Sequence, residues 1–151
     1  MVLRTLLEGW AINGITSVQS GAPLRISVAS SRLNTGTGNN ADVICGDVGM
    51  PKTVLQWFDR SCFADPAQFE FGNAPIGVVR GPGLFNTDFS IFKRTRLGGN
   101  RALELRVETF YLFNRAHFSN PNTTFGNADF GRISSTRSPS REIQLGARFL
   151  F

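Results

Sequence analysis

The feature that most constrains this chain is its C-terminal end. Apolar side chains recur at every second position there, up to the last residue; they are Ile143, Leu145, Ala147, Phe149 and Phe151. A period of two indicates a β-strand with one apolar face. A strand that finishes on a phenylalanine, without a polar tail, is typical of one that pairs sideways to close a barrel. An edge strand of a buried sheet is the alternative.

The same alternation recurs in four earlier segments. They lie at residues 9–20, 24–29, 85–91 and 103–113. Short turns are expected at residues 20–23 and 97–100, and long loops at residues 30–82 and 114–140. Short turns on one side and long loops on the other are typical of outer-membrane barrels, whose strands need about 9–11 residues to cross the bilayer. The sequence therefore predicts an all-β antiparallel meander of about five strands, the C-terminal segment of a large transmembrane β-barrel with two long extracellular loops.

Composition agrees with strands that cross a membrane. The chain has 151 residues, 41% of them hydrophobic and 18% charged, with no uncharged apolar run long enough for a membrane helix. Charged side chains fall on the strand positions opposite the apolar ones, as a water-filled lumen allows. The residues expected to face the lumen are Asp88, Glu104, Arg106, Glu108 and Arg148. Aromatic residues gather near the strand ends, where an interfacial girdle belongs.

The positive charge of the chain does not indicate a nucleic-acid binder. The net charge is +5, but the cations are mostly arginines spread from Arg4 to Arg148 without a cluster. A nucleic-acid interface concentrates such charge on one face. We therefore expect no nucleic-acid partner.

Nothing in the sequence assembles a catalytic or metal site. His117 is the single histidine, and no acid and nucleophile are placed beside it as a triad requires. Glu104 and Glu108 flank Arg106 on one strand, which favours cross-strand ion pairing over glycosidase chemistry. We expect no enzyme activity, no cofactor and no metal.

The N-terminus and the two cysteines indicate different compartments. Residues 1–10 lack the apolar core of a signal peptide. Cys45 and Cys62 lie outside any metal-binding spacing. A disulfide between them would require an oxidising compartment, and two free thiols are the alternative. A chain that is the end of a longer secreted protein would reconcile the two observations.

Several motifs, in order and at characteristic spacing, resemble the C-terminal part of TonB-dependent outer-membrane receptors of the Oar-like class, which carry a carboxypeptidase-regulatory-like N-terminal domain. The matching segments are GWAINGI (9–15), QSGAP (19–23), WFD (57–59), GPG (81–83), DFSIFK (88–93), RVETFYLFN (106–114), HFSNPN (117–122), FG (125–126), FGRI (130–133) and REIQLGARFLF (141–151).

This resemblance implies a barrel of about 22 strands with a plugged lumen, to which residues 1–151 would contribute the last strands. The plug and signal peptide have no counterpart in the sequence, so we expect a C-terminal fragment. The implied partners are outer-membrane lipid, the remainder of the barrel, the plug, the TonB complex through that plug, and a nutrient ligand that the sequence does not identify. The implied location is the outer membrane of a Gram-negative type bacterium.

Two functions remain open at this point. One is nutrient uptake, with the long loops forming the binding mouth. The other is a surface structural or adhesive role without transport. A soluble β-sandwich is a third alternative, which the terminal Phe151 and the unequal loops disfavour.

Overall fold

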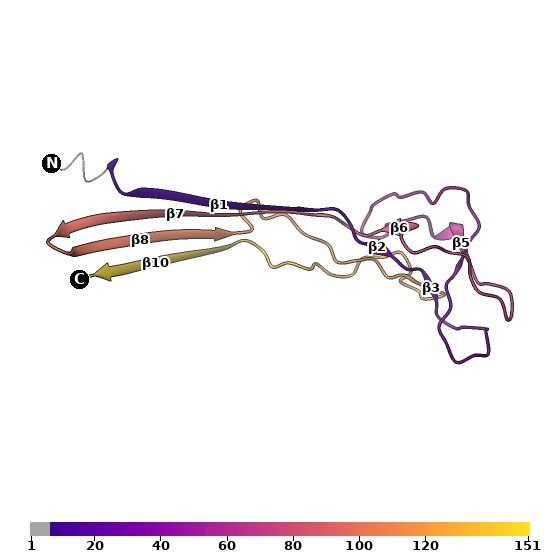
Figure 1. Cartoon of the computed structure of the whole chain (residues 1–151). Coiled ribbons are helices and arrows are strands. Elements are labelled where there is room, and N and C mark those ends of the chain that lie inside the picture. The colour runs from indigo at the N-terminus through magenta and orange to yellow at the C-terminus, as the bar shows by residue number, and fades with distance from the viewer. Residues whose placement is uncertain (1–6) are drawn as a thin grey trace. The chain divides into compact units, whose positions relative to one another are not determined.

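The longest strands of the chain form one four-stranded antiparallel sheet. The computed structural model describes residues 7–151. The sheet contains β1 (Trp10–Gln19), β7 (Leu84–Gly98), β8 (Arg101–Phe110) and β10 (Glu142–Leu150), in the order β1-β7-β8-β10 (Figure 1). The predicted all-β antiparallel fold is confirmed. Within the described residues the sheet is open and does not close into a barrel.

The chain divides into two compact units. The first, here called the sheet unit, contains the described part of Met1–Gln19 together with Leu84–Ala116 and Ser138–Phe151. The second, here called the loop body, contains Ser20–Gly83 and His117–Arg137. Each unit is described by itself below.

The register of the sheet unit carries the sequence alternation across all four strands. Ile12 lies opposite Ile91, Ile91 opposite Val107, and Val107 opposite Leu145. Because side chains alternate between the two faces of a strand, such a row keeps apolar residues on a single face. The lengths of β1, β8 and β10 are 10, 10 and 9 residues, which match the length needed to cross a bilayer.

The tight turn between β7 and β8 confirms the sequence prediction for residues 97–100. Gly98 and Gly99 both have positive φ, at 99° and 60°. A two-residue hairpin loop such as residues 99–100 needs a positive φ at its first position, Gly99, and glycine adopts it without steric cost. The pairing register shifts between Arg96 and Gly98, where the strands enter the turn.

Strand β8 is shorter than the alternation predicts, because the chain turns at Tyr111. Tyr111 has a φ of 53°, and its N–H donates to Asp88 Oδ1 at 3.0 Å. The next N–H, of Leu112, donates to the Thr87 carbonyl at 2.9 Å. The ladder thus ends at Phe110, whereas the sequence pattern continues to Phe113.

The loop body is built from short paired segments. β2 (Pro23–Leu24) pairs antiparallel with β6 (Val79–Arg80), and β4 (Asp42–Val43) pairs antiparallel with β5 (Phe63–Ala64). A 3₁₀ turn, η1 (Arg60–Cys62), precedes β5. The pair of β3 (Ser27–Val28) and β9 (Thr124–Phe125) is parallel and joins the two chain segments of the body.

The predicted strand at residues 24–29 does not belong to the sheet. β1 pairs directly with β7, so Ser20–Gly83 is a single connection that begins and ends at one end of the sheet. The prediction of a turn at residues 20–23 on the opposite side from the long loops is therefore wrong. Leu24, Ile26 and Val28 alternate because they fill a core, and a short alternation does not distinguish a core from a lipid face.

That core holds the two segments of the loop body together. Its aromatic centre is formed by Phe58, Phe63 and Phe130, whose ring centroids lie 5.1–5.7 Å apart in edge-to-face contacts. This is the geometry that aromatic quadrupoles favour. The buried residues around these rings are Leu24, Ile26, Val28, Ala41, Val48, Cys62 and Val79. The long connection at residues 30–82, which looks structureless in the sequence, therefore has a hydrophobic core.

Two glycine motifs that lie sixty residues apart in the sequence meet at the start of the body. A Cβ atom on Gly21 would lie 1.7 Å from the Gly81 carbonyl oxygen, which no side chain can accommodate. The Gly81 N–H donates to the Ala22 carbonyl at 2.9 Å. Position 21 thus needs glycine because its backbone touches that of Gly81.

Candidate functional site

One face of the sheet unit is apolar and exposed. The side chains of Ile12, Leu145 and Phe149 are more than half exposed, and Leu145 reaches 79%. Aromatic pairs lie at the strand ends: Phe85 with Phe113, and Phe149 with Phe151. A contiguous apolar face with aromatic residues at its margins is the surface that a bilayer covers in a transmembrane barrel.

Three polar side chains on this apolar face have partners. The Thr16 and Thr87 hydroxyl groups lie 3.1 Å apart across β1 and β7. Lys93 lies over the Trp10 ring, with Nζ 5.0 Å from the centroid, and also donates to the Glu8 carbonyl. Trp and Lys together at a strand end suit the interface between lipid and water, where a ring packs and an ammonium group reaches the aqueous side.

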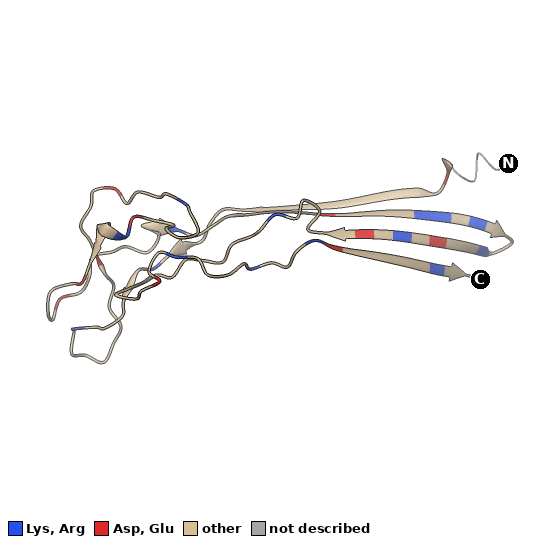
Figure 2. Cartoon of the chain, turned by 180° about the vertical axis from the view of Figure 1, so that it is seen from behind, with Lys and Arg blue, Asp and Glu red and all other residues tan. Residues whose placement is uncertain are grey.

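The opposite face carries a ladder of charges centred on Arg106. Its guanidinium group lies 3.9 Å from the Glu104 carboxylate and 3.7 Å from that of Glu108. The same group lies 4.7 Å from the Phe92 ring, on the neighbouring strand. Gly146 is the residue opposite Arg106 on β10, and it leaves room for the arginine side chain. The alternating red and blue bands on β8 in Figure 2 show this ladder.

The other two residues predicted to face the lumen lie on this same face. Arg148 is opposite Glu104, which is in turn opposite Arg94. Asp88 follows the same parity, and its carboxylate accepts hydrogen bonds from the Asn86 side chain and the Tyr111 N–H. Asp88 thus fixes the end of β8, a structural role that the alternation does not reveal. The orientation of this face toward a barrel lumen stays a prediction.

The last strand lies at one end of the sheet order. β10 pairs with β8 along its whole length, from Glu142 opposite Phe110 to Leu150 opposite Ala102. Its predicted apolar residues, Ile143 to Phe149, follow one face, and Phe151 is 96% exposed. Within the described residues its other edge has no paired strand. Such an edge is suited to pairing with a further strand.

In the loop body, Cys45 and Cys62 form a disulfide bond with a Cα–Cα distance of 5.1 Å. Cys62 belongs to the buried core, so the bond ties the 42–45 segment to the aromatic centre. Asp59 stands next to this region as the N-cap of η1. Hydrogen bonds from the Ser61 hydroxyl and the Ser61 N–H to Asp59 hold the pKa of its carboxyl below its ordinary value.

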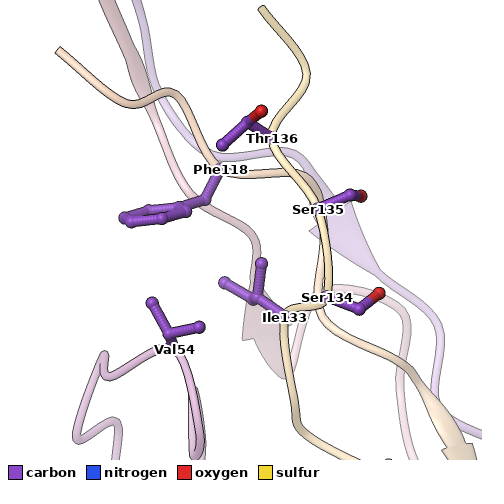
Figure 3. Close-up of a pocket in the computed structure, with 6 residues that line it drawn as sticks. All are labelled: Val54, Phe118, Ile133, Ser134, Ser135 and Thr136. Atoms are coloured by element: carbon purple, nitrogen blue, oxygen red, sulfur yellow. The ribbon is translucent and has the colours of Figure 1, made fainter.

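A pocket of about 470 Å³ opens on the loop body between residue 54 and residues 118–136 (Figure 3). Figure 3 shows Ile133 between Phe118 and Val54, whereas the Ser134 and Ser135 side chains project to the other side of their segment. The Ile133 N–H donates to the Val54 carbonyl at 2.8 Å, which holds the two walls together. The inner surface of this pocket is therefore mainly apolar.

A second pocket, of about 590 Å³, has a more polar lining. It is formed by Ser31, Arg32, Asn34, Gln68 and Phe69. The sequence prediction assigned the long loops to a binding mouth without naming these residues. A local signal was absent because the two lining segments lie more than thirty positions apart and meet only through the fold.

The described residues contain no cluster of His, Cys, Asp or Glu that could hold a metal ion. His117 is 6% exposed, and its carbonyl accepts from the Arg137 N–H at 2.8 Å. The expectation that the chain has no enzyme activity stays a prediction. Among residues 7–151, no helix is long and apolar enough to cross a membrane.

Comparison with known proteins agrees with the geometry of the sheet. No curated protein and no solved structure matches the chain. The family model described as "Outer membrane beta barrel domain" matches residues 1–144, nearly the whole chain. This family implies a location in the outer membrane. With its exposed apolar sheet face and its charged opposite face, the chain belongs to the outer membrane beta barrel domain family.

Proposed function

We propose that this chain is the C-terminal barrel segment of a TonB-dependent outer-membrane receptor of the Oar-like class. In this proposal the sheet unit forms part of the barrel wall, and the loop body contributes to the extracellular site that captures a nutrient. The rest of the barrel, the plug, and the TonB complex acting through the plug are the partners. The protein is a transporter component and not an enzyme.

The observation that carries the proposal is the opposite chemistry of the two sheet faces. Leu145 and Ile12 are exposed on one face, and the ion pairs of Arg106 lie on the other. A face of the first kind is stable against lipid, and a face of the second kind against water or a polar plug. The resemblance of the sequence motifs to TonB-dependent receptors supports the more specific assignment.

The loop body supports a receptor over a simple pore. Both of its segments are connections that leave the sheet at the end where β1 finishes and β7 begins. The other end has the tight turn at residues 99–100. A folded, disulfide-bonded unit on the long-loop side is suited to binding, because a rigid scaffold keeps side chains in place for a ligand.

Topology can be tested with cysteine labelling in intact cells. Both cysteines of this chain form the disulfide, so within residues 1–151 an introduced thiol is the one that can react. We expect T37C to react with a membrane-impermeant maleimide on intact cells. N100C, in the tight turn, should react only after the outer membrane is permeabilised. The reverse pattern would contradict the proposed orientation.

Transport is tested separately from topology. The gene, with its upstream reading frame, is expressed in cells with and without a functional TonB complex. We expect the upstream frame to encode a plug with a TonB box, and a crosslink between that box and TonB. A surface-exposed barrel whose upstream frame lacks a plug would contradict transport and would support the structural or adhesive role.

A further inference from the structure

We propose that the pocket lined by Ser31, Arg32, Asn34, Gln68 and Phe69 binds a neutral saccharide. The proposal deepens the receptor function above by naming its ligand class, and it rests on that function only for uptake, since binding itself is measured separately. The volume of about 590 Å³ lies within the range of small-molecule sites.

The lining combines one aromatic side chain with four side chains that form hydrogen bonds. Phe69 supplies the only aromatic ring among the five residues, and it is 63% exposed. Asn34 and Gln68 each present both donors and acceptors, and Ser31 presents a hydroxyl. A sugar ring has the matching surfaces: C–H groups on one face, which pack on an aromatic π-face, and hydroxyl groups around its edge.

The backbone that carries Phe69 is held in place before any ligand binds. Its N–H donates to the Arg32 carbonyl at 3.2 Å, and the next carbonyl, of Glu70, accepts from the buried Asn39 side chain at 2.9 Å. On the facing segment, the buried Leu33 lies between Arg32 and Asn34 and anchors both. A preorganised site loses less conformational entropy on binding than a mobile loop does.

The backbone of the pocket is also unusual. Phe69 has a φ of 68°, in the left-handed region that a bulky residue rarely adopts. Asn34 has a φ of 56°. Neither conformation is required to fill the core, because both side chains are exposed. Side chains kept in such positions are typical of functional surfaces.

The charges in the pocket favour a neutral ligand over an anion. The Arg32 guanidinium lies 3.5 Å from the Asp65 carboxylate, so its positive charge already has an opposite charge beside it. An anion would have to compete with Asp65. The guanidinium N–H groups that Asp65 leaves open can still donate to neutral hydroxyl groups, since the fork has five donors.

A peptide ligand is less well matched to this pocket. Recognition of an extended peptide uses a free strand edge, whose backbone forms a ladder with it. Residues 31–34 and 68–69 are not in strands. The groups presented to the ligand are side-chain amides, a hydroxyl and a guanidinium.

The test uses the protein expressed with its upstream reading frame, oxidised and purified in detergent micelles, so that the sheet keeps its neighbouring strands. Binding of maltohexaose, cellohexaose, chitohexaose, xylohexaose and mannohexaose is measured by isothermal titration calorimetry and by saturation-transfer NMR. Inorganic phosphate and a mixture of neutral tripeptides are the comparison probes. We expect at least one oligosaccharide to bind, and phosphate not to displace it.

Glycine variants separate ligand contact from folding. Phe69→Gly removes the ring at a φ that glycine adopts freely, so the fold should be kept while the Kd rises about tenfold. Asn34→Gly should raise the Kd about fivefold for the same reason. The matched control is Phe71→Gly, because Phe71 is 75% exposed two residues away and does not line the pocket. Its Kd should stay within twofold.

Three results would overturn the proposal. The first is that none of the oligosaccharides binds. The second is that Phe69→Gly and Phe71→Gly weaken saccharide binding equally. The third is that phosphate or the tripeptides bind more tightly than the oligosaccharides do. Failure of TonB-dependent uptake with intact saccharide binding would contradict the transport proposal alone. Loss of saccharide binding with intact uptake of another nutrient would contradict the saccharide proposal alone.

Discussion

The same sequence pattern serves opposite purposes in the two units of this protein. In β10, Ile143 and Leu145 alternate with polar residues and are 61% and 79% exposed. In the loop body, Leu24 and Ile26 alternate in the same way and are 7% and 0% exposed. Alternation thus identifies an extended chain with one apolar face, but it does not identify what covers that face. The sheet face needs lipid, whereas the loop body covers its own apolar residues.

The two units should therefore respond differently to the same kind of change. The loop body depends on close packing and on the disulfide, which act without a membrane. The sheet unit depends on a bilayer for its apolar face and on neighbouring strands for its edges. The following predictions test this difference, from the largest expected effect to the smallest.

Truncating the centre of the aromatic core should have the largest effect. Phe58 is fully buried among Phe63 and Phe130, so Phe58→Ala should destabilise the loop body by about 3–5 kcal/mol. Limited proteolysis at increasing urea concentration measures the stability of the loop body. The change in gel mobility on heating measures, in the same samples, whether the sheet unit stays folded. Phe71→Ala, at an exposed position, is the control. An equal loss of stability in the loop body and the sheet unit would contradict the prediction that the two units respond independently.

A charge on the apolar sheet face should lower the free energy of unfolding by less than Phe58→Ala does, and it should do so only in lipid. Leu145 lies in the middle of β10, where an arginine should destabilise the folded protein in phospholipid vesicles by about 2–4 kcal/mol. The neighbouring Gln144 lies opposite Glu108 on the charged face, so Gln144→Arg should be nearly neutral. Urea titration of both variants in vesicles measures the difference. A larger loss for Gln144→Arg would mean that the faces are assigned the wrong way round.

Removing the disulfide should affect the loop body alone. Its two cysteines are 17 residues apart in the sequence. For a closed loop of this length, the double variant Cys45→Ser, Cys62→Ser should lower the free energy of unfolding of the loop body by about 3 kcal/mol. The main reason is that the unfolded chain gains conformational entropy without the bond. Proteolysis of the body with and without a reducing agent checks this, since reductant should reproduce the variant. No sensitivity to reductant would indicate that the bond is absent in the mature protein.

The smallest effect should come from Asp59, and it should depend on pH. The pKa of its carboxyl is lowered by the two hydrogen bonds from Ser61, so the folded state binds this proton less readily than the unfolded state. Its contribution to stability is complete above the unfolded-state pKa of about 3.9 and is lost as the pH falls through the lower folded pKa. Asp59→Asn should remove this dependence. An acid-unfolding curve identical to that of the wild type would contradict it.

Much of the sheet unit could be predicted from sequence because its rules are local. Period-two alternation located β1, β7, β8 and β10, and the two glycines predicted the turn after β7. The end of β8 could not be predicted, because it depends on a carboxylate from another strand, Asp88, which binds the Tyr111 N–H.

Most contacts of the loop body could not be predicted from the sequence. Its core joins Phe58 and Phe63 to Phe130, and its polar pocket joins Asn34 to Phe69. Contacts over such separations leave no periodic signal in a single sequence. The alternation at residues 24–29 predicts an extended segment but not what covers it, and the two cysteines leave the choice between a bond and free thiols open.

The parallel pairing of β3 with β9 has a consequence for how relatives of this protein can diversify. Ser27 and Val28 from one connection lie beside Thr124 and Phe125 from the other, and the Phe125 ring contacts the Phe130 ring edge to face. Neither connection encloses this core by itself. Grafting residues 20–83 alone onto a related barrel would leave Phe58 and Phe63 without the Phe130 ring that packs against them, so we expect the two connections to be exchanged as a matched pair.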